Sequence, residues 1–150
     1  MEVSAYGIVP APPERVWDLL CDTSRYADWV DGTEAVTRTD GPARQGSTYD
    51  ELNPVLGPWK ARSRWTVTEF DAPRRQVHSG TGLPLTSEFL VIFEVTPEGD
   101  SSGVTLTLRA TPGMGAVGGA FAALMKGQID RDNRRSVENL VALAKRELHG

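Results

Sequence analysis

Few residues of the chain have the chemistry and spacing of a catalytic or metal-binding group. There is one cysteine, Cys21, and the two histidines, His78 and His149, lie far apart in the sequence. No Gly-x-Ser-x-Gly turn is present and no histidine lies near the cysteine, as a nucleophilic hydrolase would require. The histidines, cysteine and acidic residues also match no familiar spacing of metal ligands. The sequence therefore predicts no metal site, no cofactor and no hydrolase, and we interpret Cys21 as a small buried apolar residue.

His78 lies between Val77 and Ser79 in a segment with strand character. We interpret it as a surface or edge-strand residue. The alternative is an acid or base inside a pocket, because an imidazole changes its protonation state near neutral pH.

A glycine-rich segment, Gly113-Met-Gly115-Ala-Val-Gly118, has the spacing of a dinucleotide-binding loop. A dinucleotide fold needs a further parallel strand with an acidic residue about 20 positions on. Here the pattern continues as one helix to the end of the chain, so we predict no nucleotide site. We interpret the glycines as an entry to that helix where small residues allow close packing. A gate beside a cavity is the alternative.

The composition sets limits on the class of protein. The 150 residues fit one domain spanning 1–150, and 39% hydrophobic with 24% charged residues is ordinary for a globular protein. Basic residues are interleaved with acidic ones and the net charge is −4, which argues against nucleic-acid binding. No secretory signal opens the chain, and the apolar run from Ala116 to Met125 is too short to span a bilayer. We predict a cytoplasmic protein without membrane insertion, and the oligomeric state is left open, a homodimer included.

The order of helices and strands follows from turn residues and apolar periodicity. Residues 2–9 have a strand pattern that ends at Pro10. Pro12 and Pro13 suit the first turn of a short helix, and Thr23 or Ser24 can cap a second short helix that runs to Trp29. From there to about Ala110 the pattern has period two, and turn residues divide it into about six strands.

Two of these strands show which side chains face inward. Alternation of apolar and polar side chains along a strand is typical of a sheet with one face exposed to solvent. In the first strand, one face carries Trp59, Ala61, Ser63, Trp65 and Val67, and the other carries Lys60, Arg62, Arg64, Thr66 and Thr68. In the second, Phe89, Val91, Phe93 and Val95 share a face.

After Gly113 the apolar period returns to about 3.6, which predicts a helix of about 35 residues. This helix must cover the apolar face of the sheet. The stripe lapses between Ile129 and Val137, so Asp132 or Ser136 is a candidate to turn toward the sheet as a pocket residue. The whole stripe comprises Val117, Phe121, Leu124, Met125, Ile129, Val137, Leu140, Ala144 and Leu148.

The opening of the chain resembles that of the START-like superfamily, also called SRPBCC or Bet v 1-like, which contains plant allergens, lipid-transfer domains and bacterial polyketide cyclases. The resemblance rests on Ala11-Pro-Pro-Glu-Arg-Val-Trp-Asp-Leu-Leu, on Asp22, on Tyr26-Ala-Asp-Trp29 and on Gly46-Ser-Thr-Tyr49. The element order β-α-α-β6-α matches over essentially the whole chain. The resemblance implies an α+β helix-grip fold. In that fold a seven-stranded antiparallel curved sheet is wrapped around a long C-terminal helix, two short helices follow strand 1, and a ligand cavity lies between sheet and helix.

A cavity is also expected on physical grounds. A curved sheet and a straight helix cannot touch along their whole lengths, so space remains unless large side chains fill it. The polar groups that we expect near this space are Tyr49, Ser63, Ser87 and Gln128, and of these we predict Ser63 and Gln128 as ligand contacts. The apolar candidates for ligand contacts are Trp59, Trp65, Phe89, Phe93, Phe121 and Met125.

We therefore expect the chain to bind a small hydrophobic molecule such as a lipid, a polyketide or an aromatic metabolite. The alternative is an enzyme of the polyketide cyclase/aromatase/dehydratase type, with Tyr49, Arg64 or His78 as proton-transfer groups. A module that binds a protein partner is the third class, and whether the chain is an enzyme is left open.

One strand position bears on the enzyme alternative. In the cyclase branch, an arginine of the long fourth strand projects into the pocket. Trp65 stands near that place here, and Arg62 and Arg64 fall on the opposite face. A slip of one residue would exchange the two faces.

Overall fold

The computed structural model describes residues 1–148 and has the predicted helix-grip fold. The long helix and two short helices accompany a seven-stranded sheet, and a single 3₁₀ turn, η1, leads into the second short helix. In chain order the elements are β1 (Glu2–Val9), α1 (Pro13–Cys21), η1 (Thr23–Arg25), α2 (Tyr26–Trp29), β2 (Ala35–Thr39), β3 (Thr48–Leu56), β4 (Trp59–Asp71), β5 (Arg75–Thr81), β6 (Thr86–Glu98), β7 (Ser101–Pro112) and α3 (Gly115–Glu147).

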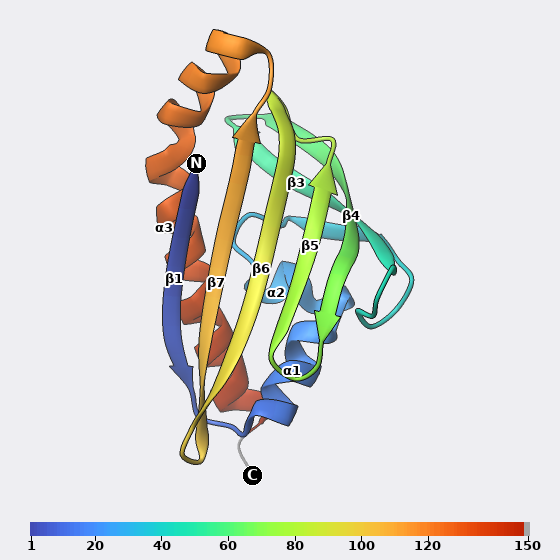
Figure 1. The fold of residues 1–150 in the computed structure, drawn as a ribbon, viewed down its shortest axis with the longest axis vertical. Helices are drawn as coiled ribbons and strands as arrows, with labels where there is room; N and C mark the ends of the chain where they lie inside the picture. Colours follow the sequence, from blue (N-terminus) through green and yellow to red (C-terminus); the bar gives the residue numbers. More distant parts are fainter. Residues whose placement is uncertain (149–150) are drawn as a thin grey trace.

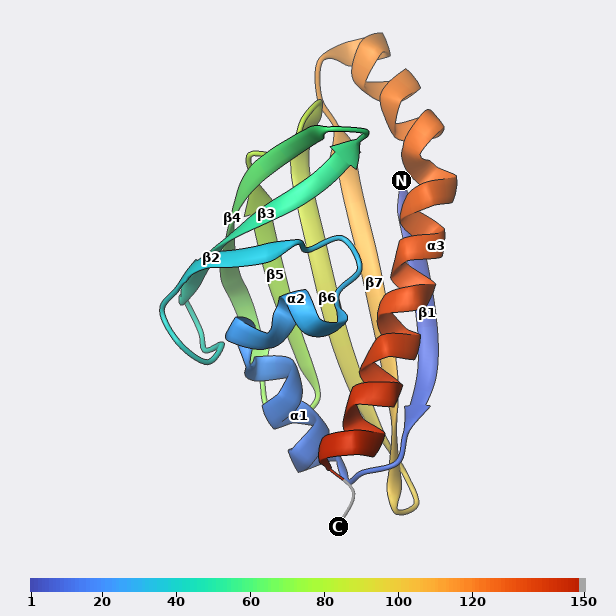
Figure 2. The ribbon, with the colours of Figure 1, turned by 180° about the vertical axis from the view of Figure 1, so that it is seen from behind.

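The sheet is antiparallel throughout, with the strand order β1-β7-β6-β5-β4-β3-β2. All helices lie on one face of the sheet, which curves around them (Figures 1 and 2). Irregular pairing accompanies this curvature, because the register of β4 against β5 shifts between Val67 and Glu69 and such bulges bend a strand. The concave face therefore encloses the space in which a ligand site was expected.

The short helix α1 is favoured by a proline in its first turn and by one buried apolar flank. Pro13 occupies the first helical turn, where the missing N–H has no intrahelical partner to lose. Val16, Trp17 and Leu20 are buried on one flank. Cys21 at the end of the helix is buried too, as the sequence predicted. The Tyr26 hydroxyl of α2 donates to the carbonyl oxygen of Leu20 at 2.6 Å, which ties the two short helices together.

The two halves of α3 are packed differently. The C-terminal half lies against β1 and β7 (Figure 2) and buries Val137, Leu140 and Ala144. Close approach to β1 requires Gly7, where a Cβ atom would lie 2.6 Å from Cγ1 of Val137. The chain just after α2 is also tied to this half, because the Ser136 hydroxyl accepts from the backbone N–H of Asp31 at 2.8 Å.

The N-terminal half of α3 departs from the predicted apolar stripe. Val117 and Leu124 are 63% and 71% exposed, so the expectation that they face the sheet is wrong. The physical reason is that this half extends past the end of the contact with β1 and lies over a cavity, so that only one narrow side of it faces protein. Among residues 1–148, no helix is long and apolar enough to cross a membrane.

Candidate functional site

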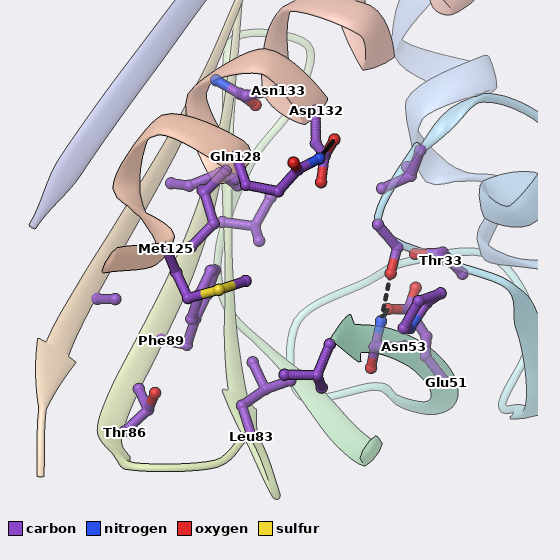
Figure 3. Close-up of a pocket in the computed structure, with 18 of the residues that line it drawn as sticks. Thr33, Glu51, Asn53, Leu83, Thr86, Phe89, Met125, Gln128, Asp132 and Asn133 are labelled. Carbon is purple, nitrogen blue, oxygen red and sulfur yellow. Dashed lines mark hydrogen bonds between the residues drawn. The ribbon is translucent and has the colours of Figure 1, made fainter. Parts of the chain in front are cut away.

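A cavity of about 440 Å³ lies between the concave face of the sheet and the N-terminal half of α3. This volume is in the range of sites that hold small organic molecules. Figure 3 shows its two sides, with Met125, Gln128 and Asp132 on α3 facing Glu51 and Asn53 on β3 across the open space.

Six of the side chains expected to contact a ligand line this cavity. Trp65 lies on β4 and its ring meets that of Phe89 edge to face, with centroids 5.8 Å apart. The space for the indole depends on Gly80 of β5, where a Cβ atom would lie 2.6 Å from the ring. The others on the wall are Phe93, Phe121, Met125 and Gln128. Their contact with a ligand stays a prediction.

Trp59 and Ser63 are the two expected contact residues that do not line the cavity. Trp59 lies at the tip of the β3–β4 hairpin, is 45% exposed, and packs against Phe121 with ring centroids 6.1 Å apart. Alternation places it on the inward face, but it lies at the very start of β4, where Phe121 of α3 covers one side of its ring. Ser63 is buried one layer behind the wall, where it takes part in a chain of hydrogen bonds.

This series of hydrogen bonds links four side chains of β3 and β4. The indole N–H of Trp65 donates to Oγ of Ser63 at 2.8 Å, and the Ser63 hydroxyl donates to Oδ1 of Asn53 at 2.5 Å. The Asn53 amide nitrogen then donates to the carbonyl oxygen of Gly32 at 2.9 Å and to Oε1 of Glu51 at 3.1 Å. Both protons of this amide are committed, so the orientation of Asn53 is fixed by its neighbours.

Glu51 is a candidate functional residue that the sequence did not indicate. It lines the cavity and is only 5% exposed. Burial raises the pKa of its carboxyl from 4.5 to about 7, against the opposing effect of the hydrogen bond from Asn53. The group therefore exchanges its proton near neutral pH. The only sequence signal is its spacing of two residues from Tyr49, which puts both on one face of a strand; the pairing with Ser63 of the inward face comes from the structure.

Tyr49 and His78 lie together, and the expectation for His78 is wrong. His78 is a fully buried residue of β5, in the middle of the sheet, and not a surface or edge residue. The Tyr49 hydroxyl and Nδ1 of His78 are 2.6 Å apart, and Nε2 of His78 is 2.7 Å from Oε1 of Gln76. An amide oxygen accepts only, so Nε2 carries the proton and Nδ1 accepts from Tyr49.

Burial sets the protonation state of this pair. Burial lowers the pKa of His78 to about 3 and raises the pKa of Tyr49 well above its usual value. Both groups are therefore neutral near pH 7, with the Tyr49 proton donated to Nδ1 of His78 and the His78 proton donated to Gln76. Tyr49 lines the cavity, whereas His78 lies behind it and reaches the cavity only through Tyr49.

Arg64 lies on the outer face of β4, away from the cavity. Its guanidinium nitrogen Nε is 2.8 Å from Oδ1 of Asp50, and the β3–β4 register shows no slip at this position. Trp65 thus occupies the inward position beside it. Ser87, another expected polar group, is exposed and donates to the carbonyl oxygen of Thr111.

The α3 side of the cavity contributes a second carboxyl group. Asp132 and Ser136 both line the cavity, where the lapse in the apolar stripe placed them as candidates. Oδ1 of Asp132 accepts from Nε2 of Gln128 at 2.7 Å. Partial burial, followed by the effect of nearby Asp31, raises the pKa of Asp132. The Ser136 hydroxyl donates to the carbonyl oxygen of Asp132 and so is not a free donor.

The glycine-rich segment forms the entry to α3. A Cβ atom on Gly118 would lie 1.5 Å from the carbonyl oxygen of Gly113, so this close approach requires glycine. The sheet beside it is antiparallel, unlike the parallel sheet of a dinucleotide fold. Its role as a gate stays a prediction. In the part of the chain that the structure describes, no three histidine, cysteine or acidic residues lie close enough to hold a metal ion, and His149 lies outside that part.

The curved antiparallel sheet, the long closing helix and the apolar cavity between them define a START-like, helix-grip protein. Within that class the chain belongs to the polyketide cyclase/dehydrase and lipid transport family, whose model matches residues 2–145.

Similar proteins are known as sequences and as structures. An uncharacterised protein of Mycobacterium tuberculosis, Rv1546, is 26% identical over 137 residues, which cover 87% of this chain and 92% of that protein. The aromatase/cyclase ZhuI of Streptomyces sp. R1128 superposes with a TM-score of 0.83 at 16% identity, over 100% of this chain and 96% of its own. TTHA0849 of Thermus thermophilus superposes with a TM-score of 0.79 at 21% identity, over 96% of this chain and 97% of its own. At these identities the two structures support the fold alone.

Proposed function

We propose that the protein binds a small hydrophobic molecule in the cavity between the sheet and α3. The observation that supports the proposal is the cavity itself, with its volume of about 440 Å³ and its wall of aromatic and aliphatic side chains. A native core has few voids larger than a water molecule. A space of this size, lined by Trp65, Phe89 and Phe93, is therefore difficult to explain as a packing fault.

Two neighbouring residues of α3 offer a matched test. Met125 is buried and lines the cavity, whereas Leu124 is exposed on the outer side of the helix. Met125→Trp places a larger side chain inside the cavity, and Leu124→Trp adds the same side chain outside it. Binding of Nile red, a neutral apolar fluorophore, is measured by titration with each variant.

We expect Met125→Trp to weaken Nile red binding at least about tenfold, which is about 1.4 kcal/mol. Leu124→Trp should leave the affinity within about threefold of wild type. Equal affinities of the two variants, or no binding by the wild-type protein, would contradict the proposal.

A second candidate function is acid–base catalysis of the cyclase or dehydratase type. The observation that favours it is Glu51, a carboxyl inside the cavity that exchanges its proton near neutral pH. A general acid or base is most effective when its pKa lies near the working pH. Turnover of enolisable diketones and β-hydroxyketones by the wild-type protein and Glu51→Gln is the assay. Loss of turnover in Glu51→Gln with retained Nile red binding supports catalysis, and no turnover by the wild type removes this candidate.

A further inference from the structure

The ionisable side chains that line the cavity are all acids. Among the residues that the structure describes, the carboxyls on the wall are Glu51 and Asp132, joined by the phenols Tyr26 and Tyr49. No lysine, arginine or histidine side chain of residues 1–148 lines the cavity. Met1 also lines it, and its α-amino group donates to the carbonyl oxygen of Ala110 at 3.0 Å. The cation that the structure describes at the wall is thus this α-amino group, which is already bonded to Ala110, and no cationic side chain is available to hold an anionic ligand.

The charge of the wall decides between ligand classes. An anion brought into a cavity loses its hydration and needs a positive partner to replace it. A fatty acid or an organic phosphate would find carboxyls in that place. A cation would instead meet a buried carboxylate that has no positive partner of its own, and would offset part of the cost of burying that charge. The wall thus disfavours anions and favours cations.

The hydrogen-bond donors around Glu51 are all neutral. Oε1 accepts from the Asn53 amide at 3.1 Å. Thr33 and Trp65, the other two residues that lower the pKa of this carboxyl, carry no charge either. The negative charge of ionised Glu51 is therefore not balanced by its neighbours. On the opposite side of the cavity lies a second acidic side chain, Asp132 (Figure 3).

We propose that the cavity selects an apolar molecule that carries a protonated amine, with Glu51 as the group that binds the amine. The inference rests on the proposed function, because it assumes that a ligand enters this cavity. An aliphatic or aromatic body would pack against Trp65, Phe89 and Met125, and the ammonium group would lie beside Glu51.

The titratable groups that face Glu51 come from several elements. They are Tyr49 on β3 itself, Tyr26 on α2 and Asp132 on α3. The pKa values of both tyrosines are raised well above the usual value, so neither tyrosine ionises between about pH 5 and pH 8. Arg135 is the basic residue that acts on Asp132, and it pairs with Asp31 at 3.3 Å.

The test compares three ligands of one shape and three charges. Decylamine, decanol and decanoate are titrated calorimetrically into the full chain at pH 8, where Glu51 is mostly ionised, each below its micellar concentration. Decylamine should bind at least about tenfold more tightly than decanol, and decanoate at least about tenfold more weakly. In Glu51→Gln the advantage of decylamine should fall below about threefold, with the decanol affinity retained. Asp50→Asn, the neighbouring carboxyl on the outer face of β3, is the matched control and should keep the preference.

A measurement on the wild-type protein covers the case in which Glu51→Gln does not fold. Between about pH 8 and pH 5 decylamine stays protonated while Glu51 becomes neutral, so the preference for decylamine should shrink toward one. A preference that is unchanged over this range, or that survives in folded Glu51→Gln, overturns the inference. Equal binding of all three ligands overturns the inference but supports the cavity as a binding site, whereas no binding of any of them contradicts the proposed function as well.

Discussion

Replacing Glu51 with glutamine should change the free energy of unfolding by a different amount at pH 8 than at pH 5, and the variant should be favoured at pH 8. The pKa of Glu51 is 4.5 when the chain is unfolded and about 7 when it is folded and buried. The folded state thus binds the proton more tightly, and stability falls as the pH rises from 4.5 to 7. Since one pKa unit corresponds to about 1.4 kcal/mol, ionising Glu51 costs the folded protein about 2 to 3 kcal/mol more at pH 8 than at pH 5. The glutamine side chain of the variant keeps the shape of the glutamate and cannot ionise.

The assay is urea unfolding of the wild type and Glu51→Gln at the two pH values. The quantity to compare is the difference in unfolding free energy between variant and wild type, which should be about 2 to 3 kcal/mol more favourable to the variant at pH 8. His78 changes stability in the opposite sense as pH falls through 6.5, but it is common to both proteins and cancels in the difference.

Asp50→Asn provides the control for this prediction. Arg64 lowers the pKa of Asp50 to about 2, so Asp50 is ionised in both folded and unfolded chains across the range tested. Its substitution should change the unfolding free energy by the same amount at pH 5 and pH 8. If Glu51→Gln also showed equal changes at the two pH values, the reasoning from burial to a raised pKa would be refuted.

Three further experiments test the site and the core. Gly80→Ala should lower the unfolding free energy by about 1 to 3 kcal/mol in urea denaturation, because the new Cβ would lie 2.6 Å from the Trp65 ring; an unchanged midpoint would show that the indole moves freely. His78→Leu should lose less stability than wild type between about pH 7 and pH 5, since unfolded His78 takes up a proton that the buried ring does not; parallel pH profiles would argue against a neutral His78. Leu140→Ala should cost about 2 to 5 kcal/mol and exposed Glu138→Ala less than about 0.5 kcal/mol, and thermal unfolding that ranks them the other way would contradict the assigned packing of α3.

The fold could be predicted because the sequence signals for its elements are local. Pro13 starts α1 and Trp17 and Trp29 are buried where the short helices need anchors. The alternation through Ser63 and Trp65 predicted the inward face of β4 except at Trp59, which is exposed at the hairpin tip. These features depend on neighbours in the chain, and the START-like resemblance then supplied the arrangement.

The parts that could not be predicted depend on distant contacts. The strand β3 reads Thr-Tyr-Asp-Glu-Leu-Asn-Pro-Val-Leu, and its inward residues include Glu51 and Asn53, so apolar alternation does not reveal its buried face. His78 is buried because β5 lies in the middle of the sheet. The sequence of a single strand does not reveal its position in the order of strands across a sheet. Leu124 is exposed because α3 extends past its support, which no periodicity within the helix discloses.

The unequal packing of α3 has a consequence for how the protein can change. The half that follows Asp132 holds core side chains such as Leu140, where substitution costs folding free energy. The half before it borders the cavity along its one protein-facing side, through residues such as Phe121, Ala122 and Met125. Under the proposed function, ligand preference and folding are encoded on different turns of one helix. Mutations in the first turns can diversify the bound molecule while the scaffold persists, and a library confined to them should retain a high share of folded members.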